Sequence, residues 1–289
     1  MKPLPKLVIF GDPRKEGVSK AIEEFADFVK DKAEIVANCN VADSNAEVLR
    51  ECDYAVVFGG DGSIISTARS VSEAGVPVVG VNVGKLGFLA EFSVEELKDF
   101  FPRLVKGDAP IDKQMMLSCT VLGNDVSGEK VEKFHSSAIN DVFITSGPPY
   151  RMVELKMLVD DQPLASCVSD GLIIATPTGS TAYNLSSGGP IVSSKMEAMV
   201  ITPICPHSLS FRPIVINAES KVEVVGIRVN EGTTISIDGQ VSLKLSIDDV
   251  VRVERQSCDF LIVNNPLRSR WDTLATKLSW AEKPKYKKH

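Results

Sequence analysis

A single carboxylate stands among three glycines at the end of an apolar run. The run Tyr54–Phe58 is followed directly by Gly59, Gly60, Asp61 and Gly62. Because glycine has no Cβ, the backbone there can take positive φ and bring its N–H groups against a phosphate. A carboxylate beside a phosphate repels it unless the acid binds a cation or accepts a proton. Both roles fit phosphoryl transfer. An Asp that only caps the next helix is the alternative, and this run alone leaves both open.

A second run of chemically active residues lies between Ser169 and Pro190. Asp170 precedes an apolar segment, and a turn rich in threonine, glycine and serine opens a short helix near Ala182. Hydroxyl and N–H groups at such a turn can hydrogen-bond a nucleobase or a sugar, and Tyr183 adds a stacking face. The same composition also suits an ordinary capping turn with glycines for packing.

The first third of the chain alternates between strand and helix patterns. Short apolar runs predict strands, and apolar residues at helical spacing predict helices. The predicted strands are 6–10, 34–36, 54–58 and 76–81, and the predicted helices are 18–30, 64–73 and 94–104. This alternation predicts an α/β fold with a doubly wound parallel sheet, which binds ligands at the carboxyl ends of its strands. The amino-terminal dipole of helix 64–73 would then point at an anion beside Asp61.

Beyond Pro110, short β-branched runs separated by turn residues predict a mainly β second domain. The predicted strands are 118–122, 141–145, 153–159, 171–175, 200–203, 213–217, 221–225, 233–237 and 250–254. A C-terminal helix packed on an apolar surface is predicted from the helical spacing of Trp271, Leu274, Leu278 and Trp280. We expect this helix to return to the first domain. The predicted division is therefore an α/β domain at 1–112, a β domain at 113–257 and a C-terminal segment at 258–289.

Composition and charge narrow the class of protein. The chain has 289 residues and a net charge of -6, which gives no electrostatic reason to bind nucleic acid. The six cysteines are scattered without a C-x-x-C pair, as in a reduced cytoplasmic protein, and only three histidines are present. A zinc site is therefore not expected, and any metal should be a hard, oxygen-bound ion such as Mg²⁺. Neither a signal peptide nor a membrane-spanning run is expected.

Several further runs occur in the same order as in a known family. They are Gly80–Leu89 (GVNVGKLGFL), Ala138–Asp141 (AIND), Thr202–Leu209 (TPICPHSL) and Thr276–Leu278 (TKL). Together with the two runs described above, they closely resemble the NAD kinases over nearly the whole chain. The run that contains Thr181 is highly specific for that family.

The resemblance implies transfer of a phosphoryl group from ATP, or from polyphosphate, to the 2′-hydroxyl of the adenosine ribose of NAD, which gives NADP. It implies that Asp61 accepts the proton of that hydroxyl, while a role in placing the metal stays open. Mg²⁺ or another divalent ion would accompany ATP and neutralise its phosphates. Oligomers are common in NAD kinases, so a homodimer or homotetramer is expected, with no nucleic-acid or membrane partner.

The resemblance also assigns residues to NAD. Asn140 offers adenine an amide donor and acceptor, and Asp141 can accept two ribose hydroxyls, although many members have Glu there. Asp170 matches the acid at the nicotinamide end, Arg151 matches a frequent basic residue but can equally be a surface arginine, and Gln240 matches a polar contact. The remaining expected NAD contacts are Asp61, Gly62, Phe88, Thr181, Ala182, Tyr183, Asn184, Leu185 and Ser186.

Two other interpretations remain. The Gly-Gly-Asp-Gly sequence also occurs in diacylglycerol and sphingosine kinases and in bacterial 6-phosphofructokinases, but these are not expected to carry Pro177–Tyr183 in this form. Gly80–Leu86 is not a Walker A loop, and no G-x-G-x-x-G opens a dinucleotide fold, which disfavours a dehydrogenase. A non-catalytic NAD(H) sensor is the second alternative, although a sensor has little reason to keep Asp61.

Overall fold

The computed structural model of the chain describes residues 4–40, 46–84 and 87–278. Lys85 and Leu86 of the GVNVGKLGFL run, and Trp280 of the predicted C-terminal helix, lie outside these ranges. The chain divides into two compact units. Unit 1 comprises Met1–Asp112 and Leu261–His289, and unit 2 comprises Lys113–Phe260.

Unit 1 is built on a sheet with the strand order β2-β1-β3-β4-β18-β5, which is parallel from β2 to β18. The bounds are β1 Lys6–Gly11, β2 Glu34–Cys39, β3 Tyr54–Gly59, β4 Val78–Asn82, β5 Ile111–Gln114 and β18 Phe260–Val263. β1 pairs in parallel with β2 and β3, and β4 pairs in parallel with β3 and β18. The α/β prediction is confirmed, and the glycine turn follows β3, an interior strand whose residues are all buried.

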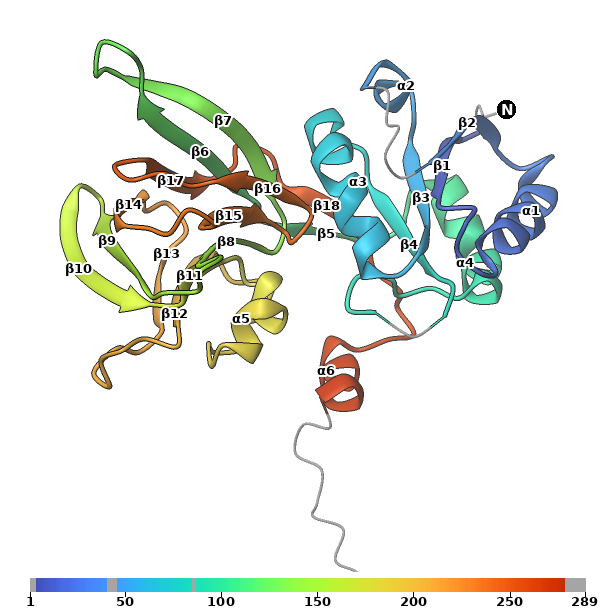
Figure 1. Ribbon diagram of the computed structural model, residues 1–289. Coiled ribbons are helices and arrows are strands. Elements are labelled where there is room, and N and C mark those ends of the chain that lie inside the picture. Colours follow the sequence, from blue (N-terminus) through green and yellow to red (C-terminus); the bar gives the residue numbers. More distant parts are fainter. Residues whose placement is uncertain (1–3, 41–45, 85–86, 279–289) are drawn as a thin grey trace, which may run out of the picture. The chain divides into compact units, whose positions relative to one another are not determined.

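Helices cover both faces of this sheet (Figure 1). The helices of unit 1 are α1 Val18–Val29, α2 Ala46–Arg50, α3 Asp61–Ala74, α4 Val94–Lys106 and α6 Arg270–Leu278. α1 and α4 share one face, where the Phe25 ring lies 5.6 Å from that of Phe58 and 5.9 Å from that of Phe101. α3 covers the other face with a buried apolar stripe that includes Ile64, Ala68 and Val71.

α3 begins at Asp61 rather than near Ile64, where the sequence predicted its start. Gly60 is its N-cap, and Gly59 turns the chain out of β3 with a φ of 149°. A Cβ at Gly59 would lie 2.3 Å from the Ser63 hydroxyl, so strand and helix are joined as closely as glycine permits. The acid of the motif is therefore part of the first turn of the helix and not of a loop before it.

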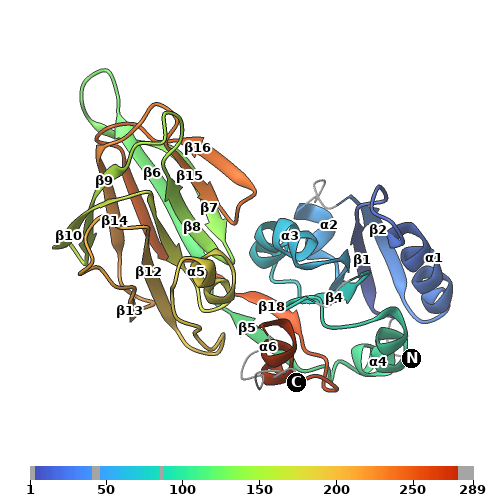
Figure 2. The ribbon, with the colours of Figure 1, turned by 60° about the horizontal axis from the view of Figure 1, so that its bottom comes forward.

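Unit 2 consists of two six-stranded antiparallel sheets (Figure 2), in the orders β10-β9-β14-β17-β6-β7 and β13-β12-β11-β8-β15-β16. The bounds are β6 Leu117–Asn124, β7 Lys130–Ala138, β8 Asp141–Thr145, β9 Val153–Val159, β10 Gln162–Ser169, β11 Gly171–Ala175, β12 Ala198–Ile204, β13 Ile214–Asn217, β14 Val222–Arg228, β15 Thr234–Ile237, β16 Val241–Lys244 and β17 Val250–Arg255. A one-turn 3₁₀ helix, Gly179–Thr181, and the short helix α5, Tyr183–Ser186, follow β11. Buried residues of both sheets, among them Val142, Leu155 and Ile174, form one apolar core. The prediction of a mainly β domain is confirmed.

The C-terminal segment belongs to unit 1, where β18 joins the first sheet beside β4. The predicted helix forms as α6, and its large side chains differ in burial. Leu274 is buried, whereas Trp271 is 69% exposed. The two residues lie three positions apart in α6, and this short helix turns only one of them inward.

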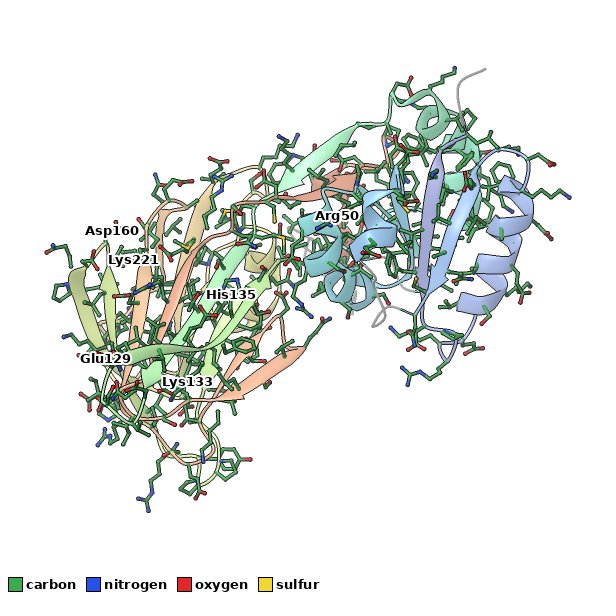
Figure 3. All side chains as sticks on the ribbon, turned by 90° about the horizontal axis from the view of Figure 1, so that it is seen from above. Arg50, Glu129, Lys133, His135, Asp160 and Lys221 are labelled. Carbon is green, nitrogen blue, oxygen red and sulfur yellow. The ribbon has the colours of Figure 1, made fainter. Side chains whose placement is uncertain are left out.

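The described residues also bear on metal and membrane binding. No helix among them is long and apolar enough to cross a membrane. None of the six cysteines forms a disulfide, and all six lie in the described part of the chain. Figure 3 shows His135 on β7, where its Nδ1 lies 3.1 Å from the Thr120 hydroxyl. No group of three or more His, Cys, Asp or Glu side chains in the described part of the chain is placed to hold a metal ion.

Candidate active site

Asp61 is half-buried, and backbone N–H groups hold its carboxylate. Oδ2 accepts a hydrogen bond from the N–H of Phe88 at 2.8 Å. Oδ1 accepts from the N–H groups of Leu89 and Ala90 at 2.9 and 3.2 Å. An ionised carboxylate offers about four lone-pair positions, so these donors leave a lone pair on Oδ2. The acid is thus held in one orientation and can accept a further hydrogen bond, for example from a hydroxyl.

The loop that supplies these donors requires glycine at two places. A Cβ at Gly87 would lie 1.9 Å from Oδ1 of Asp61. A Cβ at Gly80 would lie 2.6 Å from the carbonyl oxygen of Leu89. The GVNVGKLGFL run therefore encodes a backbone that closes around the acid, a role that the sequence analysis did not assign to it.

The Asn140–Asp141 pair is held by a carboxylate that the sequence analysis missed. Asp238 accepts hydrogen bonds from the N–H groups of Ile139, Asn140 and Asp141 at 3.1, 2.7 and 3.2 Å. Asp238 and Gly239 have φ values of 53° and 66° in the turn between β15 and β16. The Asp-Gly dipeptide predicts such a turn. It does not predict that the side chain binds backbone 97 to 99 residues earlier.

Asn140 is anchored through its backbone and not through its side chain. Its carbonyl oxygen accepts a hydrogen bond from the N–H of Thr176 at 2.8 Å. A Cβ at Gly179 would lie 2.0 Å from the same oxygen, so the turn after β11 packs directly on Asn140. The side-chain amide of Asn140 has no hydrogen-bond partner among the described residues, which leaves it able to bind a nucleobase.

Asp141 is an acid in an unusual environment, since it is only 3% exposed. Burial, and to a lesser degree the negative charge of Asp238, raise the pKa of Asp141 to about 7. A carboxyl group that titrates near neutral pH can both donate to and accept from a hydroxyl.

Asp141 and Asp170 lie at opposite ends of the β8–β11 pair. Asp141 is opposite Ala175, and Thr145 is opposite Gly171, the residue that follows Asp170. Four strand steps of about 3.3 Å separate the two ends by roughly 13 Å. Asp141 and Asp170 are thus separated along the strand direction, as an elongated ligand with a sugar at each end would require.

Tyr183 lies over the middle of this strand pair. Its ring is 5.1 Å from that of Phe143, the central residue of β8, in an edge-to-face arrangement. Burial and then the charges of Cys205, Asp141 and Asp170 raise the pKa of the Tyr183 hydroxyl. Tyr183 is still 37% exposed, so one part of the ring can meet a ligand.

The segment around α5 is held in place by Asn184, which is completely buried. Its amide nitrogen donates to the carbonyl oxygens of Ser180 and Pro190 at 3.0 and 3.1 Å. Its oxygen accepts from the Thr202 hydroxyl at 2.6 Å. Because the polar atoms of Asn184 are used inside the protein, we assign this residue to holding the segment and not to contacting NAD.

The remaining predicted contacts are accessible. Ser186, Arg151 and Gln240 are exposed, as is Gly62, while Thr181, Ala182 and Leu185 are half-buried. Phe88 is half-buried in unit 1, with the Lys277 ammonium of α6 5.3 Å from its ring centroid.

These features define a class of protein. Unit 1 carries a glycine turn and an oriented acid at the carboxyl edge of a parallel sheet, where α/β proteins bind phosphates. Unit 2 carries acids, a free amide and an aromatic ring suited to a nucleoside. The fold and the site are those of a two-domain, nucleotide-binding phosphotransferase.

Comparison with known proteins gives the family. Residues 20–109 match the ATP-NAD kinase N-terminal domain, and residues 139–264 match the ATP-NAD kinase C-terminal domain. An NAD kinase of Rhodopirellula baltica is 36% identical over 282 residues, which cover 96% of this chain and 87% of that protein. An NAD kinase of Geotalea daltonii is 35% identical over 291 residues, which cover 97% of this chain and 100% of that protein. The chain belongs to the NAD kinase family.

Two solved structures share the fold. Yeast NADH kinase complexed with NADH has a TM-score of 0.85 at 24% identity, and the match covers 99% of this chain and 91% of that one. An NAD kinase from Archaeoglobus fulgidus in complex with ATP has a TM-score of 0.74 at 25% identity, with 95% of this chain and 98% of that one covered. The resemblance drawn from the sequence is confirmed.

Proposed function

We propose that the chain transfers the terminal phosphoryl group of ATP to the 2′-hydroxyl of the adenosine ribose of NAD, which forms NADP and ADP. The observation that carries this proposal is the carboxylate of Asp61, which three backbone N–H groups orient at the start of α3, directly after a glycine turn. The related NAD kinase from Archaeoglobus fulgidus in complex with ATP supports ATP as the donor. Family membership sets aside lipid and sugar alcohols as acceptors.

In the proposed reaction, the 2′-oxygen of NAD forms a bond to the terminal phosphorus while the bond from that phosphorus to the bridging oxygen of ADP breaks. Asp61 accepts the hydroxyl proton through the lone pair left on Oδ2. The N–H groups of Phe88, Leu89 and Ala90 keep the carboxylate from turning away. Such alignment matters more in phosphoryl transfer than covalent participation by the protein.

Unit 1 is proposed to carry the phosphoryl-transfer residues, and unit 2 is proposed to bind NAD. In unit 2, Asn140 binds the adenine, and Asp141 binds ribose hydroxyls. Tyr183 stacks on the ligand, and Asp170 marks the nicotinamide end. The length of the β8–β11 pair, roughly 13 Å from four strand steps, supports a dinucleotide that lies along it. The further contacts proposed for NAD are Gly62, Phe88, Arg151, Thr181, Ala182, Leu185, Ser186 and Gln240.

Mg²⁺ bound to the donor phosphates would neutralise charge on the transferred group. The chemistry of Asp61 fits such an ion when the phosphates and water supply most of its ligands. Three of the lone-pair positions of this carboxylate already face N–H groups and the fourth is assigned to the 2′-hydroxyl, so the phosphates and water would supply the ligands of the ion. A Cβ at Gly60 or Gly62 would meet nothing within 4 Å, so these two glycines leave room for the phosphates themselves, while the φ of 149° at Gly59 turns the backbone toward them.

We further propose that the protein is a cytoplasmic homodimer or homotetramer. Six cysteines without a disulfide among them support a reducing compartment. Self-association is supported by β13, an edge strand of unit 2 on which Ile214 and Val215 are 39% and 45% exposed. Apolar edge strands pair readily with another chain. Light scattering is expected to give at least a dimer, and a monomer at assay concentration would contradict this proposal.

A panel of donors and acceptors tests the proposed reaction. The protein is incubated with Mg²⁺ and each pair of ATP or polyphosphate with NAD or NADH, and NADP(H) is read with an NADP-specific dehydrogenase. NADP formed from ATP and NAD is the expected result. Tight NAD binding without NADP or NADPH in any pair would instead indicate the non-catalytic sensor.

A further inference from the structure

Lys15 lies in the loop between β1 and α1, and its side chain reaches the first turn of α3. Its Nζ donates a hydrogen bond to the Ser63 hydroxyl at 3.1 Å. Lys15 is exposed, whereas Ser63 is buried and follows Asp61 by two positions in α3. The lysine therefore brings an ammonium beside the glycine turn from a part of the chain 48 residues away.

The fold directs this loop to the phosphate side of the sheet. β1 and β3 are parallel neighbours, and Gly11 is opposite Phe58, so both chains leave the sheet at the same edge. Two backbone hydrogen bonds shape the loop, from the N–H of Lys15 to the carbonyl of Asp12 at 3.0 Å and from the N–H of Val18 to the carbonyl of Lys15 at 3.3 Å. The backbone position of Lys15 is thus fixed by these hydrogen bonds and by the pairing of β1 with β3.

Asp12, an acid of the same loop, is engaged by Arg14. Nε of Arg14 donates to Oδ1 of Asp12 at 2.9 Å. The hydrogen bonds from Arg14 and, to a lesser degree, the charge of Lys15 lower the pKa of Asp12. The Lys15 ammonium has three N–H donors, and the described residues take one of them, at Ser63.

The charges around Ser63 favour an anion. The amino-terminal end of α3 carries a partial positive charge, and the ammonium of Lys15 adds a full one. The carboxylate of Asp61 faces the three N–H groups of Phe88, Leu89 and Ala90. A cation with unused donors beside the positive end of a helix is best explained by a ligand with negative charge.

We propose that Lys15 binds the terminal phosphoryl group of the phosphoryl donor and that the Ser63 hydroxyl holds the ammonium in place before the donor arrives. This inference rests on the proposed function. Lys15 stays protonated throughout the reaction. It neutralises the oxygens of the transferred group while the bond to the leaving diphosphate breaks and the bond to the 2′-oxygen forms.

The test compares Lys15→Met with Lys20→Met, a control that removes an exposed lysine from α1. Binding of ATP, ADP and AMP is measured together with the KM values for ATP and NAD. Lys15→Met is expected to weaken ATP about tenfold, as for the loss of one charge-assisted bond, and to leave AMP and the KM for NAD within about twofold. Lys15→Arg should restore most of the ATP affinity, and Lys20→Met should change none of these values by more than about twofold.

Ser63→Ala separates the two parts of the proposal. It should weaken ATP about threefold in the wild-type background and not at all in Lys15→Met, because the hydroxyl acts only through the lysine. Equal losses for ATP, ADP and AMP, or an unchanged affinity for ATP in Lys15→Met, would overturn the assignment. If the wild type forms NADP while Lys15→Met binds ATP normally, only this inference fails, whereas a wild type that forms no NADP removes the proposed function itself.

Discussion

Replacement of Asp141 by asparagine should make the protein more stable at neutral and alkaline pH. The fold buries this acid beside Asp238 and raises its pKa from 3.8 to about 7. A raised folded-state pKa means that the folded protein holds a proton which the unfolded chain releases. Asp141 therefore does not lower the free energy of unfolding below pH 3.8, where it is protonated in both states. The loss of stability grows as the pH rises from 3.8 to about 7 and is constant above pH 7.

The size of this cost follows from the two pKa values. They differ by about 3, and one pKa unit corresponds to about 1.4 kcal/mol, so the upper limit is about 4 kcal/mol. Local relaxation and water reduce such values, and we expect a gain of about 2 kcal/mol for Asp141→Asn at pH 8. For a unit of this size, that gain raises Tm by roughly 4–8 °C.

Thermal and urea unfolding at pH 4.5, 6 and 8 tests this reasoning. The gain of Asp141→Asn over wild type should be largest at pH 8 and should shrink steadily toward pH 4.5. Asp248→Asn is the matched control, because Asp248 is an exposed acid in a turn of the same unit. An equal gain at all three pH values, or no gain at pH 8, would refute the view that burial of a charge at position 141 opposes folding.

Three further substitutions address the residues that position the site. Gly87→Ala should lower kcat about 100-fold while NAD still binds, because the new Cβ would lie 1.9 Å from Oδ1 of Asp61 and must displace that carboxylate. An unchanged kcat would contradict the view that the position of the Asp61 carboxylate depends on a glycine at position 87. Asp238→Asn should raise the KM for NAD about tenfold, since it removes the charge that holds the N–H groups of Ile139, Asn140 and Asp141, and steady-state kinetics checks this effect. It should also lower the pKa of Asp141, because the charge of Asp238 raises that pKa. The pH range over which Asp141→Asn changes in its effect on stability should then be narrower in the Asp238→Asn background than in wild type. Asn184→Ala should lower the free energy of unfolding by about 3 kcal/mol, because it leaves the buried Thr202 hydroxyl and two carbonyl groups without their partner; a loss of NAD binding without any loss of stability would show a direct contact instead.

The strands that were predicted best are those with buried, β-branched residues. β8, β9 and β11 have the predicted bounds, because their apolar residues face a core and their ends are set by turns. β7 was not predicted. Five of its nine residues are exposed, and it lies at the edge of its sheet, so it carries little apolar pattern.

The residues of the candidate site also differ in how far the sequence predicts them. Local sequence motifs mark some of them, whereas others are defined by contacts between segments far apart in the chain. Asp61, Asn140 and Asp141 were found because short motifs mark them. Asp238 could not be found in this way, since its hydrogen bonds join segments 97 to 99 residues apart and depend on the pairing of β15 with β8. The amide of Asn184 looked like a ligand contact in sequence, and only its burial shows that it supports the fold.

The most direct test of the account is to measure turnover and NAD affinity of Asp61→Asn beside the wild type. Asparagine preserves the size of the side chain but cannot take a proton from the 2′-hydroxyl. The Kd for NAD is expected to stay within about threefold, while kcat for NADP formation falls by about two to four powers of ten. A variant that binds NAD normally and turns over at the wild-type rate would remove Asp61 from catalysis.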